Sequence, residues 1–408
     1  MSVSCTIITI GDELLIGQVI DTNSAFIAQK LNEIGIKIHR RIAISDNGLE
    51  IKNTIIEAWK NAEIIITTGG LGPTKDDITK KTICELFQVG FKRDEKTYLH
   101  VKHFFESRNR PFLEINQAQA DVPENAEVLF NARGTAPGMW IDSNGKILIS
   151  LPGVPFEMEY LIQTHVIHKL QTRFDIPPLY YAHIQTAELG ESFLAQKIEA
   201  VENSLPKDIS LAYLPSPMSV HLRLSGNVSK KTEIDNFANK IREILVDNIY
   251  GNNTTSIEEK LFSKLKENKE TITLVESCTS GYLAHLLTNI SGASDIFVGG
   301  WNVYTNDFKI NELNIKKDTI EKYTSVSEET GKELLTHALA KTNANYGISV
   351  VGYLEKSDTI TKPFAIISYG NSSLQLSKKV DLFYPRVKSK EAVAKIAFIR
   401  LYKDFLEK

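Results

Sequence analysis

Residues 63–80 read EIIITTGGLGPTKDDITK, and this stretch sets the fold of the first third of the chain. Its apolar, β-branched beginning predicts a buried strand. The strand runs into Gly69, Gly70 and Gly72, whose backbone N–H groups can approach an anion closely because no side chain intervenes. Ligands bind beyond the carboxyl ends of the strands in parallel α/β sheets, so we predict a ligand-binding turn at these glycines.

Acidic and hydroxyl residues follow the glycines directly. Asp76, Asp77 and Thr79 stand where a helix would begin, and such residues most often cap the first turn of a helix. One loop of this kind is therefore weak evidence for a site, but three more loops follow strands of the same segment. We expect ligand contacts from Gly69, Gly70, Gly72 and Thr79, from Gly11, Asp12, Glu13 and Asn23, from Gly134, Thr135 and Gly138, and from residues 151–158.

The pattern of strand-like and helix-like stretches changes twice along the chain. Short β-branched runs alternate with amphipathic helical stretches in the first third, which predicts a parallel sheet with helices on its faces. A stretch typical of a small α+β module follows, and the alternation then resumes. A chain of 408 residues also exceeds the size at which one core usually splits. We predict three domains: 1–172 (parallel α/β), 173–252 (α+β) and 253–408 (α/β).

Composition excludes several classes of protein. The formal net charge is -3, so there is no basic excess to attract nucleic acid non-specifically. Three scattered cysteines are too few for a disulfide framework or a zinc site. The N-terminus lacks the features of a signal peptide, and no apolar stretch approaches the ~20 residues of a membrane helix. We expect a cytoplasmic protein.

The first domain contains the motifs GDELLIGQVIDTNS (11–24), TTGGLGPTKDDIT (67–79), RGTAPGM (133–139) and LPGVPFEM (151–158). These four motifs resemble the molybdopterin-binding-like domain of the competence/damage-inducible CinA family. The resemblance implies a divalent-metal-dependent ADP-ribose pyrophosphatase that yields AMP and ribose 5-phosphate, with Asp46 and Asp77 as metal-site residues. Ligand sets of oxygen atoms alone favour Mg, Mn or Co. The residues do not assign which carboxylate is ligand and which is base.

The middle segment is similar to the small KH-type domain of the same family, through LGESFLAQKI (189–198) and LAYLPSPMSVHLRLSG (211–226). A KH domain binds nucleic acid through a GXXG loop. This stretch contains no such loop. We interpret the module as a spacer and expect no nucleic-acid partner.

The last domain carries a candidate nucleophile. Ser277 and Thr279 lie between a strand and a helix, where a hydroxyl can attack a carbonyl and a nearby lysine of lowered pKa can serve as base. The stretches ESCTSG (276–281) and VYTNDFK (303–309) resemble the nicotinamide-nucleotide amidohydrolase (NMN deamidase) domain of CinA proteins. The resemblance implies Ser277 as nucleophile, rather than Cys278, with Tyr304 and Lys309 as activating partners and Thr279 in the pocket.

One loop departs from that family pattern. A glycine- and proline-containing loop is expected after the strand YGISV (346–350), but residues 351–356 read VGYLEK and keep only Gly352 as a backbone donor for the substrate. The change adds bulk and places Glu355 near the position expected for a phosphate. The deamidase site is therefore expected to be weakened or lost.

Three hypotheses follow for the whole chain. The leading one is a hydrolase of pyridine-nucleotide salvage that acts on a small nucleotide and, as the resemblance implies, forms a homodimer. The second is a non-catalytic module that binds a nucleotide or molybdopterin and has a structural C-terminal domain. The third is adenylyl transfer to molybdopterin.

Overall fold

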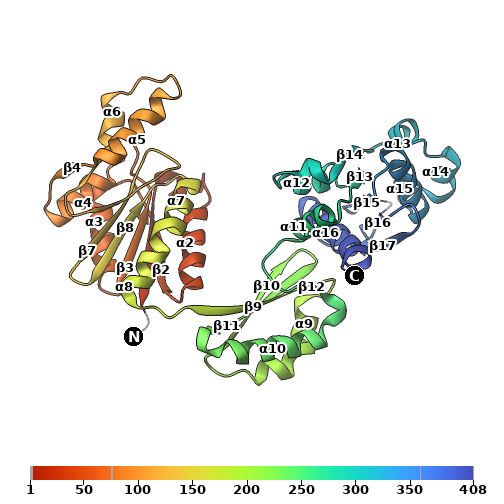
Figure 1. Cartoon of the computed structure of the whole chain (residues 1–408), viewed down its shortest axis with the longest axis horizontal. Helices are drawn as coiled ribbons and strands as arrows, with labels where there is room; N and C mark the ends of the chain where they lie inside the picture. Colours follow the sequence, from red (N-terminus) through yellow and green to blue (C-terminus); the bar gives the residue numbers. More distant parts are fainter. Residues whose placement is uncertain (1–2, 75–76, 359, 408) are drawn as a thin grey trace. The chain divides into compact units, whose positions relative to one another are not determined.

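The computed structural model describes residues 3–74, 77–358 and 360–407, so Asp76, one of the predicted helix-capping residues, lies outside the described part. The chain divides into two compact units, Met1–Leu179 and Tyr180–Lys408. Figure 1 shows a sheet flanked by helices in the first unit, and two sheets with their helices in the second. No helix among the described residues is long and apolar enough to cross a membrane.

The first unit is built on a six-stranded sheet in the order β2-β1-β3-β8-β7-β6. The first four of these strands are parallel, and the last two are antiparallel additions at one edge. This arrangement confirms the predicted α/β fold class with a mostly parallel sheet. The strands are β1 (Ser4–Ile10), β2 (Lys37–Ile44), β3 (Ile64–Thr68), β6 (Glu127–Leu129), β7 (Gly138–Ser143) and β8 (Lys146–Leu151).

Helices cover both faces of this sheet because successive strand residues point to opposite sides. In β3, Ile64 and Ile66 belong to the core cluster under one layer of helices, and Ile65 belongs to the cluster under the other. The first layer is α2 (Thr22–Glu33), α7 (Pro155–Leu161) and α8 (Ile167–Phe174); the second is α3 (Gly48–Ala58) and α4 (Thr79–Phe87). The unit also contains α1 (Asp12–Leu15), β4 (Phe91–Arg93), α5 (Glu95–Glu106), α6 (Glu114–Gln117) and β5 (Asp121–Pro123).

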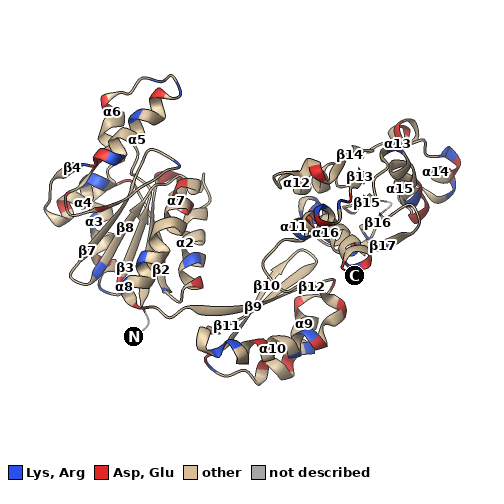
Figure 2. Ribbon diagram, in the orientation of Figure 1, with Lys and Arg blue, Asp and Glu red and all other residues tan. Residues whose placement is uncertain are grey.

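The second unit begins with the KH-like module, a sheet in the order β10-β11-β9-β12 with two helices. Figure 2 shows acidic and basic residues mixed along both helices, so neither carries charge of a single sign. The elements are β9 (Leu179–Ala187), α9 (Glu191–Asn203), β10 (Ser210–Ser216), β11 (Ser219–Asn227), α10 (Lys231–Ile244) and β12 (Ile249–Gly251).

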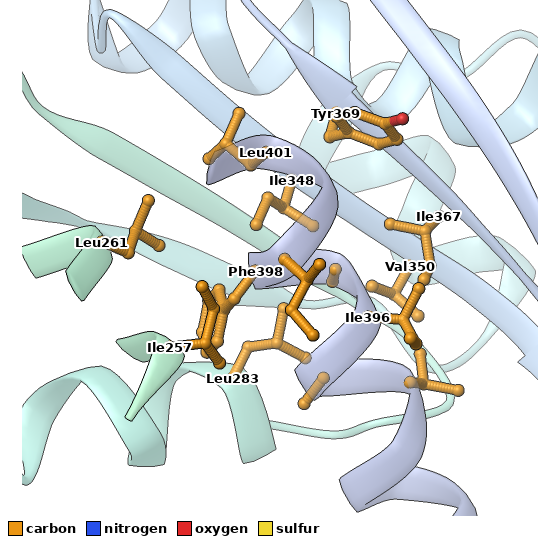
Figure 3. Packing of buried hydrophobic residues seen from close by; sticks show 14 of the residues in the cluster. Ile257, Leu261, Leu283, Ile348, Val350, Ile367, Tyr369, Ile396, Phe398 and Leu401 are labelled. Atoms are coloured by element: carbon orange, nitrogen blue, oxygen red, sulfur yellow. The ribbon is translucent and has the colours of Figure 1, made fainter. Parts of the chain in front are cut away.

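A five-stranded sheet, in the order β14-β13-β15-β16-β17, forms the rest of the unit. Helix α16 is largely buried from Ala392 to Leu401, and Figure 3 shows Ile396, Phe398 and Leu401 packed among side chains of the sheet and of α11 and α12. The elements are α11 (Ile257–Asn268), β13 (Ile272–Glu276), α12 (Tyr282–Thr288), β14 (Phe297–Asn302), α13 (Asn306–Leu313), α14 (Lys317–Tyr323), α15 (Glu328–Thr342), β15 (Tyr346–Tyr353), β16 (Phe364–Gly370), β17 (Gln375–Asp381) and α16 (Arg386–Leu401).

The KH-like module and the five-stranded domain share one core. Ala187 and Tyr250 of the module belong to the same buried cluster as the α11 and α16 side chains. Beside this cluster, the Glu188 carboxylate accepts hydrogen bonds from Arg400, with Nε at 2.6 Å, and from Lys378 Nζ at 3.0 Å. Burial acts to raise the pKa of Glu188, but the hydrogen bonds from Arg400 and Lys378 outweigh it and hold that pKa below its ordinary value.

Replacing Glu188 with glutamine is expected to lower the free energy of unfolding of the second unit by about 1–3 kcal/mol at pH 7. A carboxyl group with a depressed folded-state pKa stabilises the fold above its unfolded pKa, and this contribution is lost as the pH falls. The difference between wild type and Glu188→Gln should therefore narrow below about pH 4.3 in urea melts. Glu267→Gln, which alters an exposed pair with Lys264, is the control. Equal losses for both variants would contradict the prediction.

Candidate functional site

The loops at the carboxyl ends of the parallel strands enclose a pocket of about 460 Å³ in the first unit. Residues from loops that are far apart in the sequence meet there, as expected for a parallel sheet. The side chain of Glu157, which the sequence did not single out, lines it as well. The predicted site residues that line this pocket are Gly11, Glu13, Asp46, Gly69, Gly70, Gly72, Asp77 and Thr135.

Glycine is required at two positions of the turn after β3. Gly69 has φ +112°, and a Cβ there would lie 2.2 Å from the carbonyl oxygen of Ile10. Gly70 has φ +65°, and its Cβ would lie 2.2 Å from Thr79 Oγ1. Thr79 is buried, and its hydroxyl donates to the Gly69 carbonyl at 3.2 Å. Thr79 therefore holds the glycine turn in place and, unlike the residues above, is absent from the pocket lining.

Carboxylates gather on one side of the pocket. The backbone N–H of Asp12 donates to Asp46 Oδ2 at 3.2 Å, and that of Asp46 donates to Asp12 Oδ1 at 3.4 Å. Burial raises the pKa of Asp46, and the negative charges of Asp12, Glu13 and Asp77 raise it further. A cation would relieve this repulsion, so the donor set fits a divalent metal.

The described residues include no ready-made group of three or more His, Cys, Asp or Glu side chains that could hold a metal. Magnesium-type ions are commonly held by one or two carboxylates together with substrate phosphates and water. Asp46 and Asp77 would thus hold such an ion only with help from a bound ligand. The Asp77 carboxylate is held in place, because its Oδ2 accepts hydrogen bonds from the backbone N–H of Thr74 at 2.9 Å and from the Thr74 hydroxyl at 2.5 Å.

Glu157, in the first turn of α7, lines the same pocket as these acidic residues. Its side chain is only 9% exposed, and it accepts a hydrogen bond from Asn131 Nδ2 at 2.6 Å. Burial raises the pKa of Glu157, and the hydrogen bond from Asn131 opposes this only in part. A Cβ on Gly134 would lie 2.0 Å from the Glu157 carboxyl carbon, so Gly134 is the residue that makes room for the carboxylate.

The remaining predicted residues of the first site have different surroundings. Asn23 lines a smaller pocket of about 100 Å³ beside the main one. Gly138 is buried in β7, where a Cβ would approach the side chains of Leu129, Leu161 and Leu151, so it serves packing. Asp12 is exposed and reaches the pocket only through Asp46.

In the second unit, the structure brings Ser277 and Lys309 together. Ser277 follows β13, and Lys309 lies on α13, with 3.3 Å between Lys309 Nζ and Ser277 Oγ. Both residues are buried, and burial lowers the pKa of Lys309. Burial also raises the pKa of Cys278 to about 12, which keeps that thiol protonated. The pair therefore has the arrangement of a nucleophile and its base.

The other predicted residues of this site have different surroundings. Tyr304 is 59% exposed, and its hydroxyl accepts a hydrogen bond from Arg386 Nη2 at 2.8 Å. Thr279 is buried, and its hydroxyl has no hydrogen-bond partner among the described residues. Gly352 packs against β16, since a Cβ there would lie 2.9 Å from Ala365.

Comparison with known proteins assigns three successive segments of the chain to known domain families. Family models described as "Probable molybdopterin binding domain", "Damage-inducible protein CinA KH domain" and "CinA C-terminal domain" match residues 6–172, 183–251 and 254–403. A CinA-like protein of Flavobacterium psychrophilum is 41% identical over 412 residues, which cover 98% of each chain. The chain belongs to the CinA family. A CinA-like protein of Cytophaga hutchinsonii is 40% identical over 92% of each chain.

A solved structure of a CinA protein with unknown function from Thermoplasma acidophilum is 31% identical and covers 41% of this chain and 97% of its own, with a TM-score of 0.38.

The loop at residues 351–356 is where this chain departs from the pattern expected of the CinA family. There, the Glu355 carboxylate pairs with Arg386 Nη1 at 3.3 Å, the same guanidinium that contacts Tyr304. The negative charge that we expected in this loop is thus balanced by a neighbouring cation.

Proposed function

We propose that the first unit is a metal-dependent hydrolase that cleaves ADP-ribose to AMP and ribose 5-phosphate. The observation that carries the proposal is that the glycine turn, Asp46, Asp77 and the buried Glu157 all line one pocket. Backbone N–H groups of the turn supply donors for phosphate oxygens. A divalent metal held by Asp46 and Asp77 would neutralise charge on the diphosphate.

In the proposed reaction, a water oxygen attacks one phosphorus atom and the bridging P–O bond breaks. Glu157 accepts the proton that the attacking water loses. A carboxylate whose pKa is raised by burial is a stronger base than an exposed one, and Asn131 fixes its direction. The glycine turn holds the substrate phosphates in line for the attack.

The test of this proposal is chromatography of ADP-ribose incubated with the full chain and Mg, Mn or Co. AMP should appear with wild type and be lost with Asp77→Asn. Asp142→Asn, an exposed residue that pairs with Arg173 away from the pocket, should retain activity. Absence of AMP with every metal, from folded protein that still binds ADP-ribose, would favour the non-catalytic binding module. Transfer of AMP from ATP to molybdopterin would instead support the adenylyl-transfer hypothesis.

We also propose that the second unit hydrolyses the amide of a nicotinamide nucleotide, at a rate that the altered loop at residues 351–356 lowers. Ser277 Oγ would attack the amide carbon while Lys309 Nζ takes the hydroxyl proton. The C–N bond then breaks, Lys309 returns the proton to the departing ammonia, and water releases the acid from the serine ester. The 3.3 Å contact between the two buried side chains supports this assignment. Both activities would serve pyridine-nucleotide salvage.

A homodimer is the proposed assembly. Four large apolar side chains within the first motif (residues 11–24) are exposed, and adjacent exposed apolar residues often mark an interface. Sedimentation velocity measures the assembly directly, and a monomer at every concentration tested would contradict it. The side chains are Leu15, Ile16, Val19 and Ile20, with exposed fractions of 52%, 74%, 49% and 83%.

A further inference from the structure

Two pairs of histidines lie on helical segments of the first unit, His100 with His103 and His165 with His168. The two members of each pair have different surroundings. His103 and His168 are exposed, whereas His100 and His165 are half-buried and each contacts a backbone carbonyl of the loop at residues 130–136. The same loop contributes to the lining of the main pocket. The first histidine of each pair is therefore connected to the candidate site.

His100, on α5, holds this loop at Gly134. Its Nε2 lies 3.1 Å from the Gly134 carbonyl oxygen. Because a carbonyl oxygen can only accept, Nε2 must carry the hydrogen, and it does so in both the neutral and the charged ring. An edge-to-face contact with Phe130, with 5.1 Å between the ring centroids, fixes the plane of the imidazole. His100 thus supplies a fixed donor to a buried backbone group.

Gly134 is the part of the loop that packs against Glu157. A Cβ there would lie 2.0 Å from the Glu157 carboxyl carbon, so the glycine backbone covers one side of the carboxylate. Without a donor, the buried Gly134 carbonyl would turn towards water, because an unsatisfied buried acceptor is unfavourable. Removal of the His100 donor is therefore expected to open this side of the Glu157 carboxylate to solvent.

The start of the loop is held separately. His165 Nε2 lies 3.0 Å from the Phe130 carbonyl oxygen, and the next residue, Asn131, donates to Glu157 Oε2 at 2.6 Å. Neither hydrogen bond involves His100, so both should remain when the His100 ring is replaced. Loss of His100 should change the solvation of Glu157 and leave its hydrogen bond from Asn131.

We propose that His100 is a positioning residue, which holds the Gly134 carbonyl so that the loop backbone shields the Glu157 carboxylate from water. The inference rests on the proposed function, in which Glu157 is the base, and extends the site to a helix that carries no predicted site residue. The competing explanation is that His100 only stabilises α5. The two explanations differ in what they predict for the carboxyl group of Glu157.

The experiment titrates Glu157 by ¹³C NMR of the full chain labelled at the glutamate carboxyl carbon, without substrate. The signal is assigned by its absence from Glu157→Gln. Burial raises the pKa of Glu157 in wild type. His100→Met removes the donor but keeps a side chain of moderate length, and it should bring this pKa down towards the ordinary value for glutamate. His100→Gln supplies an N–H donor again and should restore the wild-type pKa.

His103→Met is the matched control, because His103 lies on the same helix and is exposed. It should leave the pKa of Glu157 unchanged. Release of AMP from ADP-ribose should follow the same order. His100→Met is expected to lower kcat by about 10–100-fold, since the base becomes weaker and less well placed. His100→Gln and His103→Met should remain close to wild type.

The inference is overturned if His100→Met leaves the pKa of Glu157 unchanged, if His100→Gln shifts it as far as His100→Met does, or if His103→Met shifts it as well. Loss of the cooperative thermal melt in His100→Met would indicate a general structural role and would overturn it too. A pKa that depends on His100, without AMP release by wild type, would overturn the hydrolase proposal alone. AMP release with a pKa that is independent of His100 would overturn the His100 assignment alone.

Discussion

Replacing Glu157 with glutamine is expected to lower the rate of ADP-ribose cleavage by about 10²–10⁴-fold, the usual contribution of a general base. Glutamine preserves the shape of the side chain and can still meet Asn131, but it cannot take a proton from water. Binding of ADP-ribose should change little, because the glycine turn and the Asp46–Asp77 pair are untouched. AMP release under saturating substrate measures the effect. A loss that appears in KM rather than in kcat would contradict the proposed role.

The pH dependence gives an independent check on Glu157. Its carboxylate form is the proposed base, so activity should fall on acidification through a pKa above the ordinary value for glutamate, and Glu157→Gln should lack this limb. A raised folded-state pKa means that stability declines as the pH rises through it, because the buried carboxylate then ionises. Glu157→Gln should therefore be at least as stable as wild type at pH 7. A large drop in its melting temperature would indicate a structural role instead.

Lys309→Met is expected to lower amide hydrolysis by about 10²–10⁴-fold, since it removes the base 3.3 Å from Ser277 Oγ. Ammonia released from nicotinamide mononucleotide measures the effect. Wild-type activity should rise with pH as Lys309 loses its proton, with a midpoint below the ordinary pKa of lysine because burial lowers it. Lys332→Met, which alters an exposed pair with Glu328, is the control. Similar rates for wild type and Lys309→Met would contradict the assignment.

The lowered pKa of Lys309 also makes the stability of the fold depend on pH. A lysine whose folded-state pKa is lowered binds its proton more weakly in the folded than in the unfolded protein, so stability rises with pH through this range. Lys309→Met should remove this rise and should not destabilise the protein at pH 7, because the apolar side chain suits a buried position. Thermal melts from pH 7 to pH 10 compare the two proteins.

Much of the fold was predictable because local patterns and tertiary packing agree. The β-branched run at residues 64–68 is buried throughout, and the glycines that follow it adopt backbone angles that other residues disfavour. These signals are local, and they produced the correct fold class. The sharing of a core by residues 180–252 and the last domain was not predictable, because it depends on Ala187 and Tyr250 meeting helices distant in sequence.

The site was predictable only in part. Glycines and carboxylates after strands indicated which loops converge. Glu157 lies in the stretch at residues 151–158 that was predicted to contact a ligand, but it was not singled out. A glutamate in the first turn of a helix usually serves as a cap, and the burial of this one depends on Asn131 and Gly134. Thr79 and Gly138 were predicted to contact a ligand, but in the structure one anchors the turn and the other fills the core. Residue type alone does not separate a ligand contact from an internal support.

The shared core of the second unit has a practical consequence for dividing the protein into fragments. Sequence families place a boundary between residues 251 and 254, yet a fragment that begins there would lose Tyr250 and Ala187 and expose the apolar surface of α11. Such a fragment would tend to aggregate during expression. Cutting before Tyr180 leaves that surface covered. Recombinant work on the serine–lysine site is therefore best begun with residues 180–408 as one piece.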